Sequence, residues 1–152
     1  KIDTNSFFPE MLEKSLEYLD MVTTDVKAPL NERYGVVVGL KDKWREIVDR
    51  VQESLRILSG WSGFKEARTT VVPGLISSEG EIEEIARVVR ETGFNRYTLQ
   101  QFRPYRTLDK KFEEVPSPSR EELLKLGRIA KRVAPNVRVF IFTVEKGFEE
   151  VR

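Results

Sequence analysis

Residues 66–102 read EARTTVVPGLISSEGEIEEIARVVRETGFNRYTLQQF and contain the pattern that decides the fold. The segment 66–72 is short and rich in β-branched residues, and a Pro-Gly pair ends it, as expected for a buried strand. A helical pattern over 79–91 follows, between a serine and a glycine that suit its two ends. A second strand is expected over 96–102. Two strands joined by a helix in this way predict a parallel pair with a right-handed crossover.

The same alternation continues through the rest of the chain. Apolar residues at helical spacing predict further helices, and short β-branched runs predict further strands. The helices are expected over 9–19, over 41–58 and, after the capping-box pair Ser119 and Glu122, up to Val133, and the strands over the second half of 18–26 and over 137–144, with a first strand ending at 3–5. The expected fold class is therefore α/β, a mostly parallel sheet with helical crossovers, either as an open sheet or as part of a (β/α) barrel.

The composition narrows the chemistry that is open to this chain. The 152 residues suit one domain, and 26 Lys and Arg against 25 Asp and Glu leave a net charge of +1. This balance gives no reason to expect a nucleic-acid partner. The sequence has no cysteine and no histidine. Thiolate metal sites, iron–sulfur ligation, a cysteine nucleophile and a serine–histidine triad are thus excluded within these residues.

The sequence also gives expectations about membrane association and cellular location. No apolar run approaches the ~20 residues that a membrane helix needs, so we expect no membrane partner. The start, Lys1-Ile2-Asp3, is neither a signal peptide nor a starting methionine. We expect a cytoplasmic protein whose chain begins inside a longer one. The excess of Lys, Glu and Arg over Asn and Gln is also typical of heat-adapted proteins.

Polar residues stand at the carboxyl end of each predicted strand. They are Asp3, Thr4 and Asn5 on the first, Asp25 and Lys27 on the second, Arg68 and Thr70 on the third, and Gln100 and Gln101 on the fourth. Because ligands of parallel α/β folds bind at the carboxyl ends of the strands, we expect these side chains to converge there. Asp25 and Lys27 are two residues apart and therefore share a face of the sheet. Arg68 and Thr70 share a face for the same reason.

Such a set of side chains can hold a zwitterion. The cationic residues Lys27 and Arg68 would take a carboxylate. The acidic residues Asp3 and Asp25 would take an ammonium group, a hydroxyl or a hard cation. The alternative is that these charges are solvated or form surface ion pairs of little energetic consequence.

Two other stretches are weaker candidates for a functional site. The segment 96–106 interleaves arginines with aromatic residues, which suits base stacking, the wall of a substrate or partner groove, or a packed loop. The balanced net charge disfavours the first of these uses. The stretch Gly35–Gly39 lacks the third glycine and the strand-to-helix context of a dinucleotide-binding loop.

Five short motifs occur in an order that resembles a known family. They are Asp3-Thr4-Asn5, Asp25-Val26-Lys27-Ala28-Pro29, Tyr34 to Gly39, Arg68 to Gly74, and Leu99-Gln100-Gln101-Phe102-Arg103-Pro104. This order resembles the radical S-adenosylmethionine (SAM) activating enzymes of glycyl-radical proteins. The activating proteins of anaerobic ribonucleoside-triphosphate reductase are most similar, and those of pyruvate formate-lyase are more distant. The resemblance covers residues 1–104, and residues 105–152 are expected to form a C-terminal extension of loop, helix and strand.

The resemblance implies a fold, a cofactor and a partner. The fold would be the C-terminal part of a partial (β/α) barrel. In this family, reductive cleavage of SAM at a 4Fe–4S cluster gives a radical that takes a hydrogen atom from a glycine of the partner, a glycyl-radical enzyme. Asp3, Thr4 and Asp25 match positions that line the methionine end of SAM and a nearby cation site. Lys27 and Arg68 match residues beside the SAM carboxylate.

The chain also departs from the family. The Cys-x3-Cys-x2-Cys loop and the Gly-Gly-Glu strand end are absent, so we expect neither cluster ligands nor a catalytic residue in this chain. Ser6 stands where the family usually has glycine, and no histidine lies near Gln101-Phe102. We therefore expect part of a longer activase that does not cleave SAM by itself. Its first strand, over 1–4, would be an exposed sheet edge that favours self-association.

Two other hypotheses stay open beside the activase. One is a non-catalytic α/β module that binds a nucleotide or an amino-acid-like ligand at its strand ends. The other is a partner-docking domain whose contact surface is the segment 96–106. Binding of SAM that depends on Lys27 would favour the activase or the binding module over the docking domain.

Overall fold

The computed structural model describes residues 1–107 and 109–152 and contains one six-stranded sheet. The strands lie side by side in chain order; the first five are parallel, and the sixth is antiparallel to the fifth. They are β1 (Ile2–Thr4), β2 (Met21–Asp25), β3 (Phe64–Val71), β4 (Arg96–Gln101), β5 (Arg138–Thr143) and β6 (Gly147–Glu150). The expected α/β fold with a mostly parallel sheet is confirmed.

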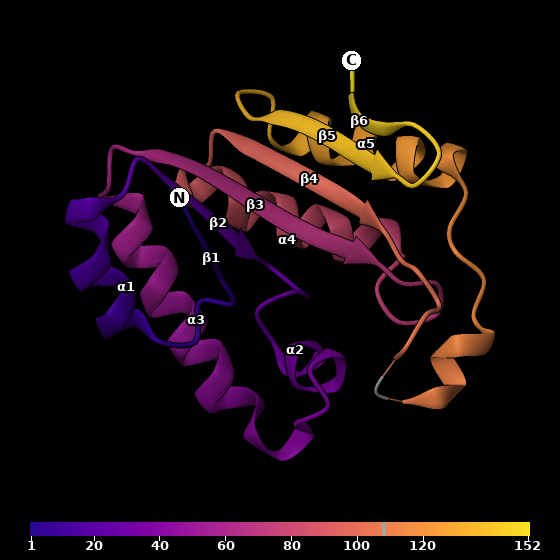
Figure 1. The fold of residues 1–152 in the computed structure, drawn as a ribbon, viewed down its shortest axis with the longest axis horizontal. Coiled ribbons are helices and arrows are strands. Elements are labelled where there is room, and N and C mark those ends of the chain that lie inside the picture. Colours follow the sequence, from indigo (N-terminus) through magenta and orange to yellow (C-terminus); the bar gives the residue numbers. More distant parts are fainter. Residues whose placement is uncertain (108) are drawn as a thin grey trace.

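The long helices lie on one side of this sheet. They are α1 (Pro9–Ser15), α3 (Trp44–Ser59), α4 (Glu79–Thr92) and α5 (Arg120–Val133), and a short helix α2 (Glu32–Val37) lies between β2 and α3. Crossovers of one hand between strands in chain order place every helix on the same face. Accordingly, α1 contacts α3, α3 contacts α4, and α4 contacts α5, and Figure 1 shows α4 and α5 behind the sheet.

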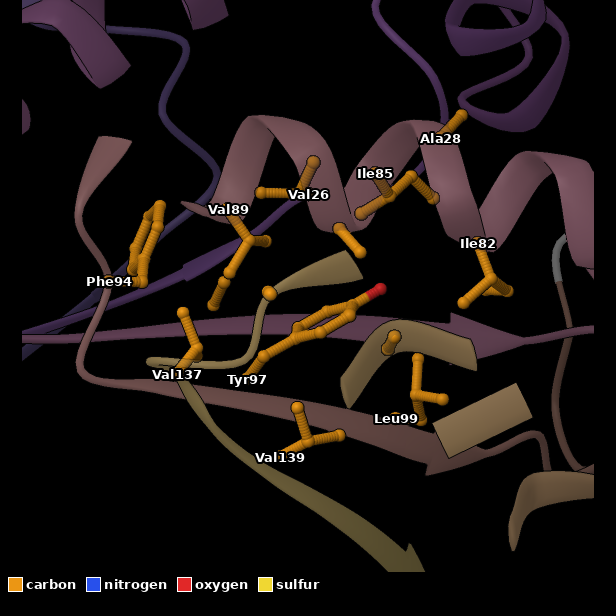
Figure 2. Packing of buried hydrophobic residues seen from close by; sticks show 14 of the residues in the cluster. Val26, Ala28, Ile82, Ile85, Val89, Phe94, Tyr97, Leu99, Val137 and Val139 are labelled. Carbon is orange, nitrogen blue, oxygen red and sulfur yellow. The ribbon is translucent and has the colours of Figure 1, made fainter. Parts of the chain in front are cut away.

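The hydrophobic core fills the space between the sheet and these helices. Side chains alternate between the two faces along each strand, so Tyr97 and Leu99 of β4 both point to the helix side. Tyr97 is in register with Val139 of β5, and all three residues are fully buried. Figure 2 shows them packed beneath Ile85 and Val89 of α4. The helix layer therefore covers the apolar rows of the sheet.

The helix ends follow the capping chemistry that the sequence predicts. The Ser78 side chain accepts the Glu81 N–H, and the Glu81 carboxylate accepts the Ser78 N–H, which together form a capping box at the start of α4. Ser119 and Glu122 form the same arrangement at the start of α5. Gly93 ends α4 in the left-handed conformation, with φ of 73°.

Two elements were not predicted. The helix α2 has six residues, which is too short for helical periodicity to show, and two of them are β-branched valines. The strand β6 reads GFEE and has little apolar alternation; it is fixed by pairing with β5 and by the contact of Phe148 with Phe142. The C-terminal extension thus ends in a β-hairpin, whereas we expected a single strand.

Three 3-10 turns refine the expected boundaries. The helix predicted over 9–19 ends as α-helix at Ser15 and continues as a 3-10 turn over Leu16–Tyr18. A second turn, Lys41–Lys43, precedes α3. A third, Lys110–Glu114, lies in the stretch that we expected to be loop.

The two edges of the sheet differ. Within the described residues, β1 pairs with β2 on one side and has no strand on the other, whereas β6 covers the far side of β5. Only three residues long, β1 offers a short template for pairing with another chain. Self-association through this edge stays a prediction.

The packing of α4 on the sheet predicts the effect of a core truncation. Ile85 is fully buried, so Ile85→Ala should lower the free energy of unfolding by about 2–5 kcal/mol through lost burial and a residual cavity. The neighbouring Glu84 is exposed, and Glu84→Ala should change stability by no more than about 0.5 kcal/mol. Urea unfolding of both variants measures the difference; equal losses would contradict the placement of Ile85 in the core.

Candidate functional site

Four charged side chains meet on the face of the sheet opposite the helices. The Arg68 guanidinium lies between two carboxylates, with Nη1 3.0 Å from Asp3 Oδ1 and Nε 3.2 Å from Asp25 Oδ1. The Lys27 ammonium lies 3.0 Å from the second oxygen of Asp25. We call Asp3, Asp25, Lys27 and Arg68 the charged cluster. The expected convergence of these four residues is therefore observed.

The backbone register brings the cluster together. Asp25 ends β2 directly opposite Arg68 of β3, and Asp3 lies in β1, which pairs with β2. Residues in register across parallel strands share a face, so the charges on three strands point the same way. The cluster borders a hollow of about 410 Å³ lined by Asp3, Thr4, Asn5, Asp25 and Arg68.

Solvent reaches the cluster, which bears on what it can do. The Arg68 side chain is 25% exposed and Asp3 is 50% exposed. Ion pairs this accessible add little to stability, on the order of 0–1 kcal/mol each. Lys27 and Arg68 also carry more N–H donors than these contacts use. The cluster can therefore exchange its internal partners for a ligand that carries both charges.

The other predicted strand-end residues lie around the cluster. Thr4 lines the hollow, and its Oγ1 accepts the Ser6 N–H at 3.0 Å. Thr70 is in register with Gln100 and shares the face of Arg68. Gln101 lies elsewhere: its amide donates to the Pro118 carbonyl, and its Oε1 accepts the Val144 N–H, both at 2.9 Å. Gln101 thus ties β4 to the C-terminal extension and is not part of the cluster.

The turn after β1 accommodates Ser6, which stands where the family that the sequence resembles usually has glycine. Ser6 has φ of 60°, a left-handed conformation that costs an L-residue about 1–2 kcal/mol. Three hydrogen bonds offset this cost: the Ser6 N–H to Thr4, the pairing of its hydroxyl with that of Thr24, and the Ser54 hydroxyl to the Ser6 carbonyl. These hydrogen bonds fix the turn that presents Asn5 to the hollow.

Tyr34 of α2 holds the end of β2 in place. Its hydroxyl donates to the Asp25 carbonyl at 3.3 Å and accepts the Lys27 N–H at 3.5 Å. Burial raises the pKa of the Tyr34 phenol to about 12, and the hydrogen bond from Lys27 only partly opposes this rise. The sequence marked Tyr34 only as part of a motif. No local pattern around Tyr34 indicates this supporting role, because the groups that it binds lie at the end of β2.

A second polar group lies on the same face, nearer the amino ends of β3 and β4. The buried Glu66 carboxylate accepts the Thr98 hydroxyl at 2.8 Å and lies 3.1 Å from Arg96 Nε. The Arg96 guanidinium stacks on Phe140 and Phe148, 4.2 and 4.6 Å from the ring centroids. Arg96 is thus committed within the sheet, so the segment 96–106 does not present all its arginines to a partner.

The described residues show no metal centre of the usual kind. No group of three or more His, Cys, Asp or Glu side chains is arranged there to hold a metal ion. Instead, the Arg68 guanidinium lies between Asp3 and Asp25 and pairs with both. A cation site at these aspartates stays an expectation from the resemblance.

Comparison with known proteins identifies a curated relative of this chain. No family model matches the chain. A curated protein of Methanocaldococcus jannaschii, "Putative glycyl-radical enzyme activating enzyme MJ1227", is 34% identical over 151 residues, or 98% of this chain. This chain is a relative of the glycyl-radical enzyme activating enzymes. It spans 60% of that relative's length.

Two solved structures have a fold similar to that of this chain. A radical SAM methyltransferase from Sphaerobacter thermophilus has a TM-score of 0.69 at 16% identity, covering 92% of this chain and 39% of the methyltransferase. A domain of a pyruvate-formate lyase-activating enzyme from Bacteroides vulgatus has a TM-score of 0.69 at 12% identity, covering 93% of this chain and 79% of that domain. These likenesses show the fold alone: this chain has the fold of part of each of these two proteins.

The hydrogen bonding of Tyr34 predicts its titration in this relative of the activating enzymes. In ¹³Cζ-tyrosine NMR spectra the Tyr34 phenol should titrate with a pKa of about 12 while the chain stays folded. Because the folded pKa exceeds the ordinary value of 10.0, the contribution of Tyr34 to stability is complete at neutral pH and falls as the pH rises from 10 towards 12.

Two variants assign the tyrosine signals. Tyr34→Phe removes the Tyr34 resonance, and Tyr97→Phe identifies the second tyrosine whose pKa is raised by burial. Titration of Tyr34 near pH 10 in the folded chain would show that its hydroxyl is not enclosed against β2.

Proposed function

We propose that this chain supplies part of the SAM site of a radical SAM enzyme that generates a glycyl radical on a partner protein. The observation that carries the proposal is the Arg68 guanidinium between Asp3 and Asp25, with the Lys27 ammonium beside them. The name of the Methanocaldococcus jannaschii relative supports the reaction class, and the barrel fold of the solved neighbours supports the cofactor.

The charged cluster fits the methionine end of SAM. That end carries one carboxylate and one ammonium group, and the charged cluster offers two cations and two carboxylates. Asp3, Asp25 and Arg68 line one hollow, and Lys27 lines a second hollow that shares Asn5 with the first. Lys27 and Arg68 would bind the carboxylate through charge-assisted hydrogen bonds, and Asp3 and Asp25 would accept from the ammonium group. The hollow of about 410 Å³ lies within the size range of small-molecule sites.

Residues of the charged cluster and residues next to it would orient SAM. Tyr34 fixes the backbone of Asp25 and Lys27, and the Ser6 turn fixes Asn5 and Thr4 at the rim. Thr4 is proposed as the fifth residue of the site. SAM bound at this position would supply the radical chemistry. The residues of this chain would bind and orient its charged end.

A 4Fe–4S cluster does not fit the residues of this chain. Such clusters are held by cysteine thiolates, and the sequence contains none. The relative is longer than the segment that this chain matches. We propose that the cluster ligands belong to residues outside these 152, and that this chain alone does not cleave SAM.

The partner and the location are further parts of the proposal. We propose a glycyl-radical enzyme as the partner, with anaerobic ribonucleotide reductase as the specific candidate. Cytoplasmic location is proposed with it. None of the helices in the described part of the chain is long and apolar enough to cross a membrane.

A second candidate function is a non-catalytic module that binds a nucleotide or an amino-acid-like ligand. The sequence without cysteine favours it, because the chain has no means to hold the iron–sulfur cluster itself. The same charged cluster would be the binding site. The two candidates differ in whether SAM is preferred over other zwitterions such as methionine.

The charged cluster predicts the effect of removing its cations. Isothermal titration calorimetry should show that the 152-residue chain binds SAM, and that Arg68→Met and Lys27→Met each weaken binding about tenfold or more, because each removes a charge-assisted hydrogen bond. Arg87→Met changes an exposed arginine of α4 and should leave the affinity unchanged. A wild-type chain that binds no SAM, or equal losses in all three variants, would contradict the proposal.

A further inference from the structure

The short helix α2 lies beyond the carboxyl end of β2, next to the charged cluster (Figure 1). It has six residues, Glu32–Val37, and two of them are valines. Helices shorter than ~12–15 residues are marginal by themselves in water, and β-branched residues add little to their stability. The position of α2 therefore depends on its contacts with the rest of the chain.

One residue of α2 holds the end of β2. The Tyr34 hydroxyl accepts the Lys27 N–H and donates to the Asp25 carbonyl, and Tyr34 is 1% exposed. Asp25 and Lys27 both belong to the charged cluster, where their side chains pair with each other. The backbone that carries two of the four charges therefore depends on where α2 places Tyr34.

The preceding residue, Arg33, ties α2 to α4. Its Nη2 lies 2.7 Å from Glu81 Oε1, and its Nε lies 3.2 Å from the same oxygen. The same Nη2 also donates to the Leu75 carbonyl, in the connection between β3 and α4. A guanidinium held at two points fixes an orientation as well as a distance, because its donors lie in a rigid plane.

The partner carboxylate is itself fixed at the start of α4. Glu81 Oε2 accepts the N–H groups of Ser77 and Ser78 and the Ser78 hydroxyl, at distances of 3.2, 3.0 and 2.7 Å. Burial by itself would raise the pKa of the Glu81 carboxyl, but its hydrogen bonds, including the one from Arg33, outweigh this effect and lower the pKa. Arg33 therefore binds a charged partner that is held within the helix layer.

The remaining contacts of α2 do not use the Arg33 side chain. The Asn31 side chain caps the helix by accepting the backbone N–H of Arg33 at 2.9 Å. Gly35 packs so closely on α3 that an added Cβ would lie 2.6 Å from the Trp44 Cβ. A chain without the Arg33 guanidinium should therefore keep α2 and lose only its connection to α4.

We infer that Arg33 is a positioning residue for the charged cluster. By pairing with Glu81 it sets the orientation of α2, and Tyr34 transmits this orientation to the end of β2. Arg33 does not line the hollow of the charged cluster, so it acts through Tyr34 and not on the ligand itself. This inference rests on the proposed function, because the ligand whose binding Arg33 would support is SAM.

Removal of the guanidinium tests this role. In Arg33→Met the ¹³Cζ signal of Tyr34 should titrate with a pKa below the wild-type value of about 12, towards the ordinary 10.0, because a looser α2 admits water to the phenol. Isothermal titration calorimetry on the same variant should show SAM binding weakened about fivefold or more, as the loss of one well-placed hydrogen bond would cause.

Arg132→Met is the matched control. Arg132 also pairs with a glutamate of α4, Glu83, at 3.3 Å, but this pair joins α4 to α5 and does not involve α2. The control should keep the wild-type titration of Tyr34 and the wild-type affinity for SAM. If Arg33→Met and Arg132→Met give the same titration and the same affinity, the inference is overturned.

A double-mutant cycle assigns the effect to the ion pair. Glu81→Gln keeps an oxygen that can accept the Ser78 N–H, so the capping box can persist, but it removes the charge that Arg33 binds. This variant also repeats the test if Arg33→Met does not fold by circular dichroism. The two single variants should weaken SAM binding equally, and the double variant should lose little more. Losses that add would overturn the inference, because Arg33 would then act without Glu81.

The Tyr34 titration separates this inference from the proposed function, because it is measured without SAM. An unchanged titration in Arg33→Met, in a chain that binds SAM, would overturn the inference and leave the cofactor site standing. A lowered Tyr34 pKa in Arg33→Met, in a chain whose wild type binds no SAM, would overturn the cofactor site and support the hold of Arg33 on the end of β2.

Discussion

Within residues 1–107 and 109–152, helices cover only one face of the sheet, and the rest of the structure depends on this constraint. Along each strand, side chains alternate between a face sealed by α3, α4 and α5 and a face without such a cover. The sealed rows are apolar, as at Tyr97 and Val139. Polar side chains on the uncovered face have no helix to pair with, so they form hydrogen bonds and ion pairs with side chains of neighbouring strands. Parallel pairing in register makes this possible, because it places Asp25 directly opposite Arg68.

The charged cluster and the pairing of the buried Glu66 with the partly exposed Arg96 are two ways in which the sheet meets that constraint. Deep in the sheet, Glu66 has Arg96 and the Thr98 hydroxyl as partners, and Arg96 is covered by aromatic rings. At the carboxyl ends the charges stay open to solvent, so their pairing is weak and exchangeable. The Glu66 carboxylate is enclosed between its partners, whereas both carboxylates of the charged cluster are accessible and suited to binding. The helix α2 connects the binding region to the helix layer through Tyr34.

The sequence predicted what periodicity and chain order control. The long helices, the five parallel strands and the convergence of Asp3, Asp25, Lys27 and Arg68 follow from local patterns together with the right-handed crossover. It did not predict α2 or β6, because each is short and is fixed by distant residues: Arg33 by Glu81, and Phe148 by Phe142. Gln101 was grouped with the site by its position, although its amide spans two loops of the extension. The role of Tyr34 could not be predicted, because its hydrogen bonds join backbone groups on another element.

The central claim is that the charged cluster holds the zwitterionic end of SAM. A crystal structure of the 152-residue chain grown with SAM tests it most directly. The account predicts the methionine carboxylate within hydrogen-bond distance of Lys27 or Arg68, with the ammonium group facing Asp3 or Asp25. SAM bound elsewhere on the chain, with the contacts of Arg68 to Asp3 and Asp25 unchanged, would contradict it.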